Sequence, residues 1–389
     1  MSGAPEKAGQ VEGLIGEVDQ LLGMPMPVPL RQALEAVPRH LFLPDRFWLR
    51  DGEGGYRVCE RASDPEGWLE AAYSDAPLVT RFTDGLPTSS ASMPSMVVRT
   101  LHLAGLGDLD GTSGRVLELG TGTGFNAALL CALVGERRVS SVELDPELSE
   151  LAGRNLRDAG CAPELVVGDA AQGWPAGGPY ARVVATFSVD RVPRAWLEQT
   201  EPDGLVVTPW ASAWCRYGTL ELAVGGHGRD ARGRFHAFAS YMPMRRANAA
   251  GTGTGAESPG GPAAESVSGL SPWTVAGGDL DAEFHIGLSV PGAAFAWDSG
   301  GEHAPVRLEL TDEAGESRAT VDYDGHRADR FAVAQAGPRR LWDEVSDAYE
   351  RWESLGRPGV GQYGVTVDRS GEHATWVTAT GGRERPVVP

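Results

Sequence analysis

A glycine-rich segment at residues 118–124 constrains the fold of this chain more than any other feature of its sequence. Its residues, Glu-Leu-Gly-Thr-Gly-Thr-Gly, follow the apolar run Val116–Leu119 and precede a helical pattern over residues 126–134. Glycines at a strand-to-helix junction let the chain turn tightly and let a ligand approach the backbone, because no Cβ stands in the way. The pattern predicts a ligand-binding turn; a bare structural turn or a dinucleotide loop would look similar.

Apolar runs and helical stretches alternate after this segment. The pair Asp145-Pro146 has the form of an N-cap followed by proline at the first helical position. Alternating strands and helices predict a parallel sheet covered on both faces. Beyond Leu220 the strand pattern continues without helices to about Met242, which predicts antiparallel strands that close the sheet. The expected parallel strands, besides the one before the glycines, are residues 139–143, 164–167, 182–186 and 205–208.

Composition divides the 389-residue chain into three parts. Residues 1–246 hold the predicted sheet and, before it, helices at residues 11–22 and 29–36 and a loop at residues 51–70. Residues 247–271 are rich in Gly, Ala, Ser and Pro and bury too little surface to offset their ordering entropy, so we expect a flexible linker. Residues 272–389 read as an accessory α+β domain, with strands at 283–290, 306–310 and 319–323 and an amphipathic helix at 341–355.

Charge and composition exclude several kinds of partner. The chain has 34 Lys and Arg against 53 Asp and Glu, a net charge of -19, which repels nucleic-acid backbones. No apolar run approaches the roughly 20 residues of a membrane span, and the first residues do not resemble a signal peptide, so we expect a cytoplasmic protein without membrane contact. The 4 cysteines are far apart and no histidine has a partner at ligand spacing, which predicts no metal site.

Two acidic residues follow the glycines at informative positions. Glu143 ends the second strand about 20 residues after the glycine turn, where a carboxylate can accept hydrogen bonds from both hydroxyls of a ribose. Asp169 ends the third strand, where an acid can meet an adenine amino group. Together with the glycines, these acids indicate a nucleoside-containing ligand.

This order of glycine turn, ribose acid and adenine acid resembles class I S-adenosylmethionine-dependent methyltransferases. The resemblance implies a Rossmann-like sheet, S-adenosylmethionine as cofactor and S-adenosylhomocysteine as product. It also implies that Glu118 helps to orient the amine of the methionine part through water. The cofactor-binding residues implied in this way are Glu118, Gly120, Thr121, Gly122, Gly124, Glu143, Asp169 and Ala170.

Further motifs narrow the resemblance on the acceptor side. Residues 37–44 (Val-Pro-Arg-His-Leu-Phe-Leu-Pro), 72–78, 92–97, 168–170 and 174–175 stand in the order and approximate spacing of protein L-isoaspartate O-methyltransferases. That family implies esterification of an isoaspartyl or aspartyl carboxylate, with the Ser92 hydroxyl contacting the carboxylate; Ser89 or Ser90 could assist. An aspartyl carboxyl is already ionised at neutral pH, so this chemistry needs no general base. Arg39 and His40 are expected to be structural.

The chain also departs from the repair enzymes of that family. Met93 stands where they carry Gln, residues 83–90 replace a Gly-His-Gly stretch, and residues 51–70 look like an insertion. Residues 89–95, 207–210 and 242–245 resemble a subgroup that modifies ribosomally made peptides such as lanthipeptides, lasso peptides and graspetides. That subgroup implies an aspartyl residue of a modified, macrocyclic precursor peptide as substrate, with an aspartimide and then isoaspartate as products. A repair methyltransferase and a non-catalytic peptide-binding protein are the alternatives; the sequence leaves the oligomeric state open.

Overall fold

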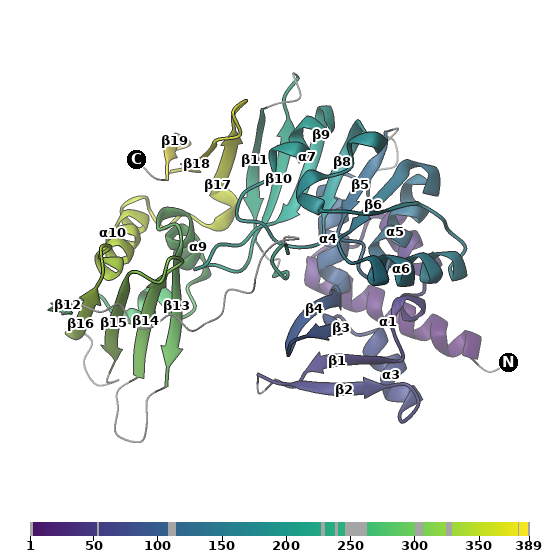
Figure 1. Ribbon diagram of the computed structural model, residues 1–389, viewed down its shortest axis with the longest axis horizontal. Helices are drawn as coiled ribbons and strands as arrows, with labels where there is room; N and C mark the ends of the chain where they lie inside the picture. The colour runs from purple at the N-terminus through teal and green to yellow at the C-terminus, as the bar shows by residue number, and fades with distance from the viewer. Residues whose placement is uncertain are drawn as a thin grey trace.

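The computed structural model describes residues 3–387, apart from residues 53, 108–113, 227–229, 238–239, 246–262, 300–305, 324–328 and 380. Three sheets organise these residues, and Figure 1 shows them side by side: a large central sheet, a small sheet below it and a third sheet formed by the C-terminal region. The predicted fold class, a class I methyltransferase α/β fold with a C-terminal α+β region, is confirmed.

The central sheet has the strand order β19-β18-β17-β11-β10-β9-β8-β5-β6-β7. Its strands β5 to β9 are parallel to one another. The other strands pair antiparallel, as the sequence predicts for the closing strands β10 and β11. The parallel strands are β5 (Val116–Leu119), β6 (Val139–Glu143), β7 (Glu164–Val167), β8 (Tyr180–Ala185) and β9 (Thr200–Pro209). The closing strands are β10 (Thr219–Val224) and β11 (Ala231–His236).

Helices cover both faces of this sheet and build two of the three hydrophobic cores. One core joins α1, α2, α4 and α5 to the sheet; its helices are α1 (Gly3–Leu22), α2 (Val28–Ala36), α4 (Pro94–Leu103) and α5 (Phe125–Val134). On the other side, α7 (Arg194–Glu198) buries Trp196 completely. Helix α6 (Pro146–Asp158) begins as expected, because the Asp145 carboxylate accepts hydrogen bonds from the backbone N–H groups of Glu147 and Leu148.

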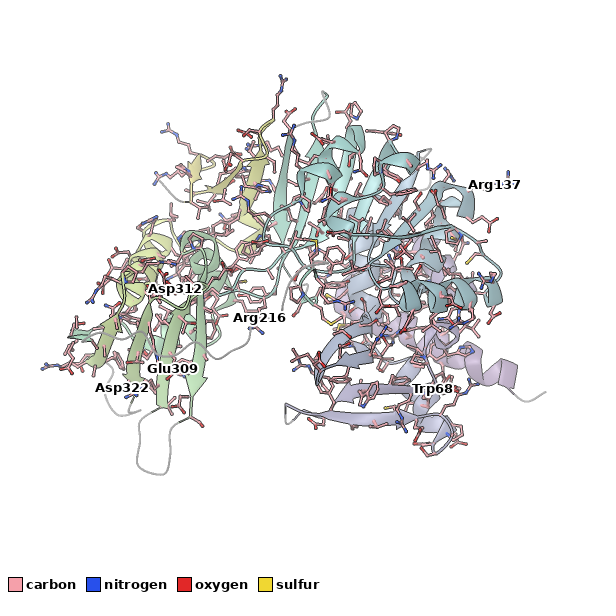
Figure 2. The ribbon with its side chains drawn as sticks, viewed as in Figure 1. Trp68, Arg137, Arg216, Glu309, Asp312 and Asp322 are labelled. Carbon is pink, nitrogen blue, oxygen red and sulfur yellow. The ribbon has the colours of Figure 1, made fainter. Side chains whose placement is uncertain are left out.

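The small sheet, which we call the insert sheet, has the order β2-β1-β3-β4. It consists of β1 (Arg46–Arg50), β2 (Tyr56–Glu60), β3 (Leu78–Thr83) and β4 (Leu86–Ala91), with α3 (Pro65–Ala72) packed against it through Trp68 (Figure 2). The prediction of a loop at residues 51–70 was therefore wrong. The described residues Asp51, Gly52, Gly54 and Gly55 lie between β1 and β2, and Asp64 caps α3 by accepting from the Gly67 N–H group.

The C-terminal sheet has the order β12-β16-β15-β14-β13 and packs against α8 to α10. Its strands are β12 (Ala264–Ser268), β13 (Ala293–Asp298), β14 (Val306–Asp312), β15 (Arg318–Tyr323) and β16 (Phe331–Ala336). The helices are α8 (Pro272–Ala276), α9 (Leu280–Ser289) and α10 (Leu341–Ser354). Ion pairs join neighbouring strands, Arg307 with Asp322 at 2.5 Å and Arg318 with Glu309 at 2.6 Å. Figure 2 labels the two acids of these pairs on the C-terminal sheet. Buried Trp342, Tyr349 and Trp352 make α10 part of the core, as expected.

Residues 283–290 form most of helix α9, so the prediction of a strand there was wrong. The helix lies between two cores: Phe284 joins the core of the central sheet, while Ala282 and Ile286 join that of the C-terminal sheet. A helix that buries opposite faces loses its 3.6-residue pattern, so periodicity could not identify it.

Two predicted boundaries also need correction. Residues 264–268, inside the expected linker, form β12, while residues 247–262 of that linker lie outside the described residues. At the other end, β17 (Tyr363–Val367), β18 (His373–Thr378) and β19 (Glu384–Pro386) extend the central sheet, with β17 antiparallel to β11. The last three strands of the C-terminal region thus belong to the central sheet of residues 1–246 rather than to the C-terminal sheet. Strand periodicity identifies a strand but not the sheet that it joins.

Candidate active site

The predicted cofactor residues meet at one edge of the central sheet. Strand β6 lies between β5 and β7, and all three are parallel, so their carboxyl ends point to the same edge. Gly120 follows β5, Glu143 ends β6, and Asp169 follows β7. The topology therefore brings the glycine turn and the two acids together.

The glycine turn requires glycine for two separate reasons. Gly120, Gly122 and Gly124 have φ values of 95°, 57° and 97°, in the left-handed region where a side chain is strained. A Cβ on Gly120 would also lie 2.5 Å from the Thr186 hydroxyl oxygen. At Gly122 the nearest atom to a Cβ would be the Ser90 carbonyl oxygen, 4.0 Å away, so this face of the turn looks toward the acceptor strand β4.

The two predicted nucleoside acids differ in their surroundings. Glu143 is buried, and its carboxylate accepts from the N–H groups of Gly122 at 2.9 Å and Asp145 at 3.1 Å, while burial raises its pKa. Asp169 is half-buried and accepts from the Ala171 N–H group at 2.9 Å. The adjacent Ala170 is buried, and its carbonyl accepts from the Trp196 indole at 2.7 Å. Both acids are fixed by backbone donors at the strand ends.

Glu118 is completely buried beneath the glycine turn. Its carboxyl group accepts hydrogen bonds from the Asn126 amide at 2.7 Å and from the Ser141 hydroxyl, which also bonds the Thr121 hydroxyl at 2.6 Å. Burial raises the pKa of Glu118 to about 7. The roles of Asn126 and Ser141 were not identified from the sequence; the available signal was a polar residue at the start of the apolar helix α5 and another in the middle of β6.

The three candidate serines lie at the end of β4 or just beyond it, but they do not share one environment. Ser92 lies between β4 and α4 and is half-buried, and no described residue bonds its hydroxyl. Ser90 is also half-buried, with its carbonyl oxygen facing Gly122. Ser89 is buried, and its hydroxyl accepts from Thr80 at 2.9 Å within the insert sheet. This geometry leaves Ser92 and Ser90, not Ser89, available to a ligand.

Arg39 holds the acceptor segment from inside. Its buried guanidinium donates to the carbonyl oxygens of Ala72, Ser74, Ala76, Ala91 and Ser92 at 2.9–3.4 Å. Burial lowers its pKa to about 10, so the group stays charged at neutral pH. The neighbouring His40 bonds the Tyr73 hydroxyl at 2.7 Å. Both residues are structural, as expected, and Arg39 ties β4 to the loop after α3.

Asp75 fixes the start of helix α4. Its carboxylate accepts from the Ser95 N–H group at 2.7 Å and from the Ser95 hydroxyl at 2.6 Å, and Ser95 is buried. Asp75 and Ser95 lie in the family motifs at residues 72–78 and 92–97, but the sequence does not predict that they pair. Ser92 is thus positioned by Arg39 on one side and by this cap on the other.

A segment after β11 completes the site and was not recognised as part of it. Met242 and Met244 form backbone hydrogen bonds with Ser188, at 2.9 Å each, in the turn that follows β8. The Tyr241 phenol lies next to Thr100 of α4, and burial raises its pKa to about 12. Residues 241–244 therefore link the turn after β8 to helix α4. The motif at residues 242–245 was the signal.

Other classes of site are not found in the part of the chain that the structure describes. No group of three or more His, Cys, Asp or Glu side chains is arranged there to hold a metal ion. The 4 cysteines are all free thiols. No described helix is long and apolar enough to cross a membrane.

Comparisons with known proteins agree with this geometry. Residues 60–216 match the family model for protein-L-isoaspartate(D-aspartate) O-methyltransferase. Protein-L-isoaspartate O-methyltransferase 1 of Archaeoglobus fulgidus is 36% identical over 179 residues, which cover 46% of this chain and 69% of the relative. The enzyme of that name from Pyrococcus abyssi is 30% identical over 217 residues, 55% of this chain and 85% of the relative.

The fold has a solved counterpart as well. A structure of a protein-L-isoaspartate O-methyltransferase has a TM-score of 0.52 at 21% identity and covers 94% of this chain and 98% of its own. That likeness concerns the fold, and it extends beyond the cofactor domain to the C-terminal region. On the sequence matches and the arrangement of the site, this chain belongs to the protein-L-isoaspartate O-methyltransferase family of S-adenosylmethionine-dependent carboxyl O-methyltransferases.

Proposed function

We propose that the chain transfers the methyl group of S-adenosylmethionine to a carboxylate of a peptide at this sheet edge. The observation that carries the proposal is the approach of β4 to the glycine turn, where the Ser90 carbonyl lies 4.0 Å from the Cβ position of Gly122. Any ligand lying along the turn is then next to the segment that presents Ser92.

The cofactor would occupy the strand ends. Glu143 supplies the carboxylate for two ribose hydroxyls, and Asp169 and Ala170 stand where an adenine ring would end. Gly122 carries no side chain, so the methionine part could lie close to the backbone of the turn. Glu118 lies below the turn and acts through Asn126 and Ser141 rather than by direct contact. When bound, the sulfonium supplies an activated methyl group.

The chain's own work would be to orient an anion and keep it dry. A peptide carboxylate is ionised at neutral pH, so no residue has to remove a proton. The Ser92 hydroxyl would donate to the non-attacking oxygen, and Arg39 holds the Ser92 backbone in place at 2.9 Å. Correct placement of two reactants can lower a barrier by about 7–11 kcal/mol, which is the main catalytic effect available here.

An isoaspartyl residue is the acceptor that the relatives support, since the matched enzymes are named for it. The free carboxylate of isoaspartate is attached directly to a backbone that is lengthened by one carbon. In this reading the enzyme would accept short linear isoaspartyl peptides.

A second candidate acceptor is an aspartyl residue of a ribosomally made, macrocyclic peptide. The departures from the repair enzymes at Met93, residues 83–90 and residues 51–70 favour it, because these residues lie in or next to the segment that presents Ser92 or in the sheet that ends at it. After esterification, the next backbone nitrogen would attack the ester carbonyl carbon and expel methanol. This step gives an aspartimide, which can hydrolyse to isoaspartate.

Mass spectrometry of peptides incubated with S-adenosylmethionine tests the proposal. We expect a gain of one methylene in an isoaspartyl peptide or in a cyclic aspartyl precursor; in the second case loss of methanol should follow. Binding of S-adenosylhomocysteine without a mass change in either peptide would instead indicate a non-catalytic peptide-binding protein.

The Ser92→Ala variant assigns the acceptor role. It should lower kcat for methyl transfer by about tenfold or more while S-adenosylhomocysteine affinity stays unchanged, because the lost hydrogen bond is to an anion. Ser354→Ala, at the exposed end of α10, is the control and should change neither quantity. Equal loss of turnover and cofactor affinity in Ser92→Ala would make Ser92 structural.

A further inference from the structure

The insert sheet has two unlike faces. One face is closed: Phe47 and Cys59 are buried, and the rings of Phe47 and Trp68 of α3 lie 5.7 Å apart. Phe47 and Cys59 are directly opposite in the register, so they mark the same side of the sheet. Their neighbours along the strands, Trp48 and Val58, which are also opposite each other, must point to the other side.

The other face carries aromatic side chains that remain partly exposed. Trp48 and Phe82 form an edge-to-face pair at 5.0 Å, and Tyr56 adds a second at 5.3 Å. All three rings are half-buried, and Val58 beside them is 52% exposed. An apolar face of this kind, open to solvent, indicates a contact surface. We call it the aromatic face.

The register connects the aromatic face to the active site. Val58 is opposite Trp48, Trp48 is opposite Val79, and Val79 is opposite Ser90. Residues directly opposite in a sheet share a face, so these four form one row across it. The row ends at the strand whose Ser90 carbonyl faces the cofactor turn. With strands about 4.8 Å apart, it spans roughly the length of four extended residues.

Charge is compatible with an acidic occupant. Arg50 places its guanidinium over the Tyr56 ring, 5.6 Å from the ring centroid, at the far end of the aromatic face. In a chain of net charge -19, this cation counters repulsion of a peptide that carries carboxylates.

We propose that the aromatic face is the docking surface for the peptide segment next to the methylated residue. This inference rests on the proposed function and deepens it. The occupant is an extended stretch of the substrate with a large apolar side chain roughly four residues from the accepting carboxylate. That side chain lies against Trp48 and Val58, and the carboxylate lies beside Ser92.

Val58→Glu tests the surface with little effect on folding, because Val58 is half exposed on the edge strand β2. The matched control is Val267→Glu, since Val267 is 58% exposed on β12, the edge strand of the C-terminal sheet. The probes are linear isoaspartyl and head-to-tail cyclic aspartyl peptides with leucine roughly four residues from the acceptor, and short acceptors of both kinds without that leucine.

For the leucine peptides, Val58→Glu should raise KM about tenfold relative to wild type, and Val267→Glu should leave it unchanged. For the short acceptors, and for S-adenosylhomocysteine affinity, both variants should match wild type. Equal KM values for the two variants with the leucine peptides would overturn the docking surface alone. Failure of the wild-type enzyme to methylate any of these peptides would overturn the proposed function itself, and the docking proposal with it.

Discussion

The two sides of the active site are built in different ways. On the cofactor side, Glu143 and Glu118 are buried on adjacent parallel strands, and backbone N–H groups or short side chains hold them. On the acceptor side, Ser92 follows an edge strand of a partly exposed sheet, and one arginine from a distant part of the chain holds it. Local turns therefore define the cofactor side, whereas the acceptor side depends on long-range contacts. This difference predicts where substitutions separate binding of the cofactor from turnover of the peptide.

Arg39→Lys should have the largest effect of these substitutions. It should lower stability and methyl transfer without weakening cofactor binding. A lysine cannot reach five carbonyl oxygens that diverge from the planar guanidinium, so several buried acceptors lose their partner. We expect the free energy of unfolding to fall by about 2–4 kcal/mol and methyl transfer to fall at least tenfold.

Denaturant unfolding and steady-state kinetics measure these effects. Arg46→Lys is the control, because Arg46 pairs with Glu60 at the surface and should change stability by less than about 0.5 kcal/mol. If Arg39→Lys weakens S-adenosylhomocysteine binding as much as it slows methyl transfer, the two sides are not separable.

Glu143→Ala should act on the cofactor side with the next largest effect. Loss of a charged acceptor for the ribose hydroxyls costs about 1.5–3 kcal/mol, which is a roughly tenfold to hundredfold rise in the Kd of S-adenosylhomocysteine by calorimetry. Glu150→Ala removes an exposed acid of helix α6, which follows β6, and should leave Kd unchanged. An unaltered Kd in Glu143→Ala would mean that Glu143 does not bind the ribose.

The cofactor side was largely predictable from the sequence, and the acceptor side was not. Strands β6 and β7 have their predicted bounds, and the glycine turn lies where the residue pattern placed it. Its determinants, glycine conformation and strand ends, are local. The insert sheet pairs β1 with β3 across α3, and nothing in residues 51–70 indicates that partner. Similarly, the bonds from Arg39 to Ala91 and Ser92 join residues more than fifty positions apart.

Glu118→Gln should change how the free energy of unfolding depends on pH. The pKa of Glu118 is about 7 in the folded protein against an ordinary value of 4.5. The folded state keeps a proton that the unfolded chain releases, so the free energy of unfolding is highest below the ordinary pKa and declines as the pH rises through about 7. The variant should flatten this decline in thermal unfolding between about pH 5 and pH 8. An identical pH profile in both proteins would mean that Glu118 ionises normally.

Arg81→Gln should have the smallest effect on binding and turnover. It tests the contact between the acceptor side and the cofactor side of the active site. Arg81 of β3 pairs with Asp145 at 2.6 Å and Glu147 at 3.1 Å, next to the ribose acid. Half-exposed pairs contribute about 0.2–1 kcal/mol, so cofactor Kd and peptide KM should each rise by less than about fivefold. A tenfold or larger change in either constant would make this ion pair a principal coupling between the two sides.

The most direct test of the account is to locate the transferred methyl group. Wild-type protein is incubated with S-adenosylmethionine carrying an isotopically labelled methyl group and with isoaspartyl and cyclic aspartyl peptides, and the products are fragmented by tandem mass spectrometry. We expect label on the accepting carboxylate as a base-labile ester, or as released methanol if an aspartimide forms. Label on a nitrogen, or peptides that remain unlabelled while S-adenosylhomocysteine binds, would contradict it.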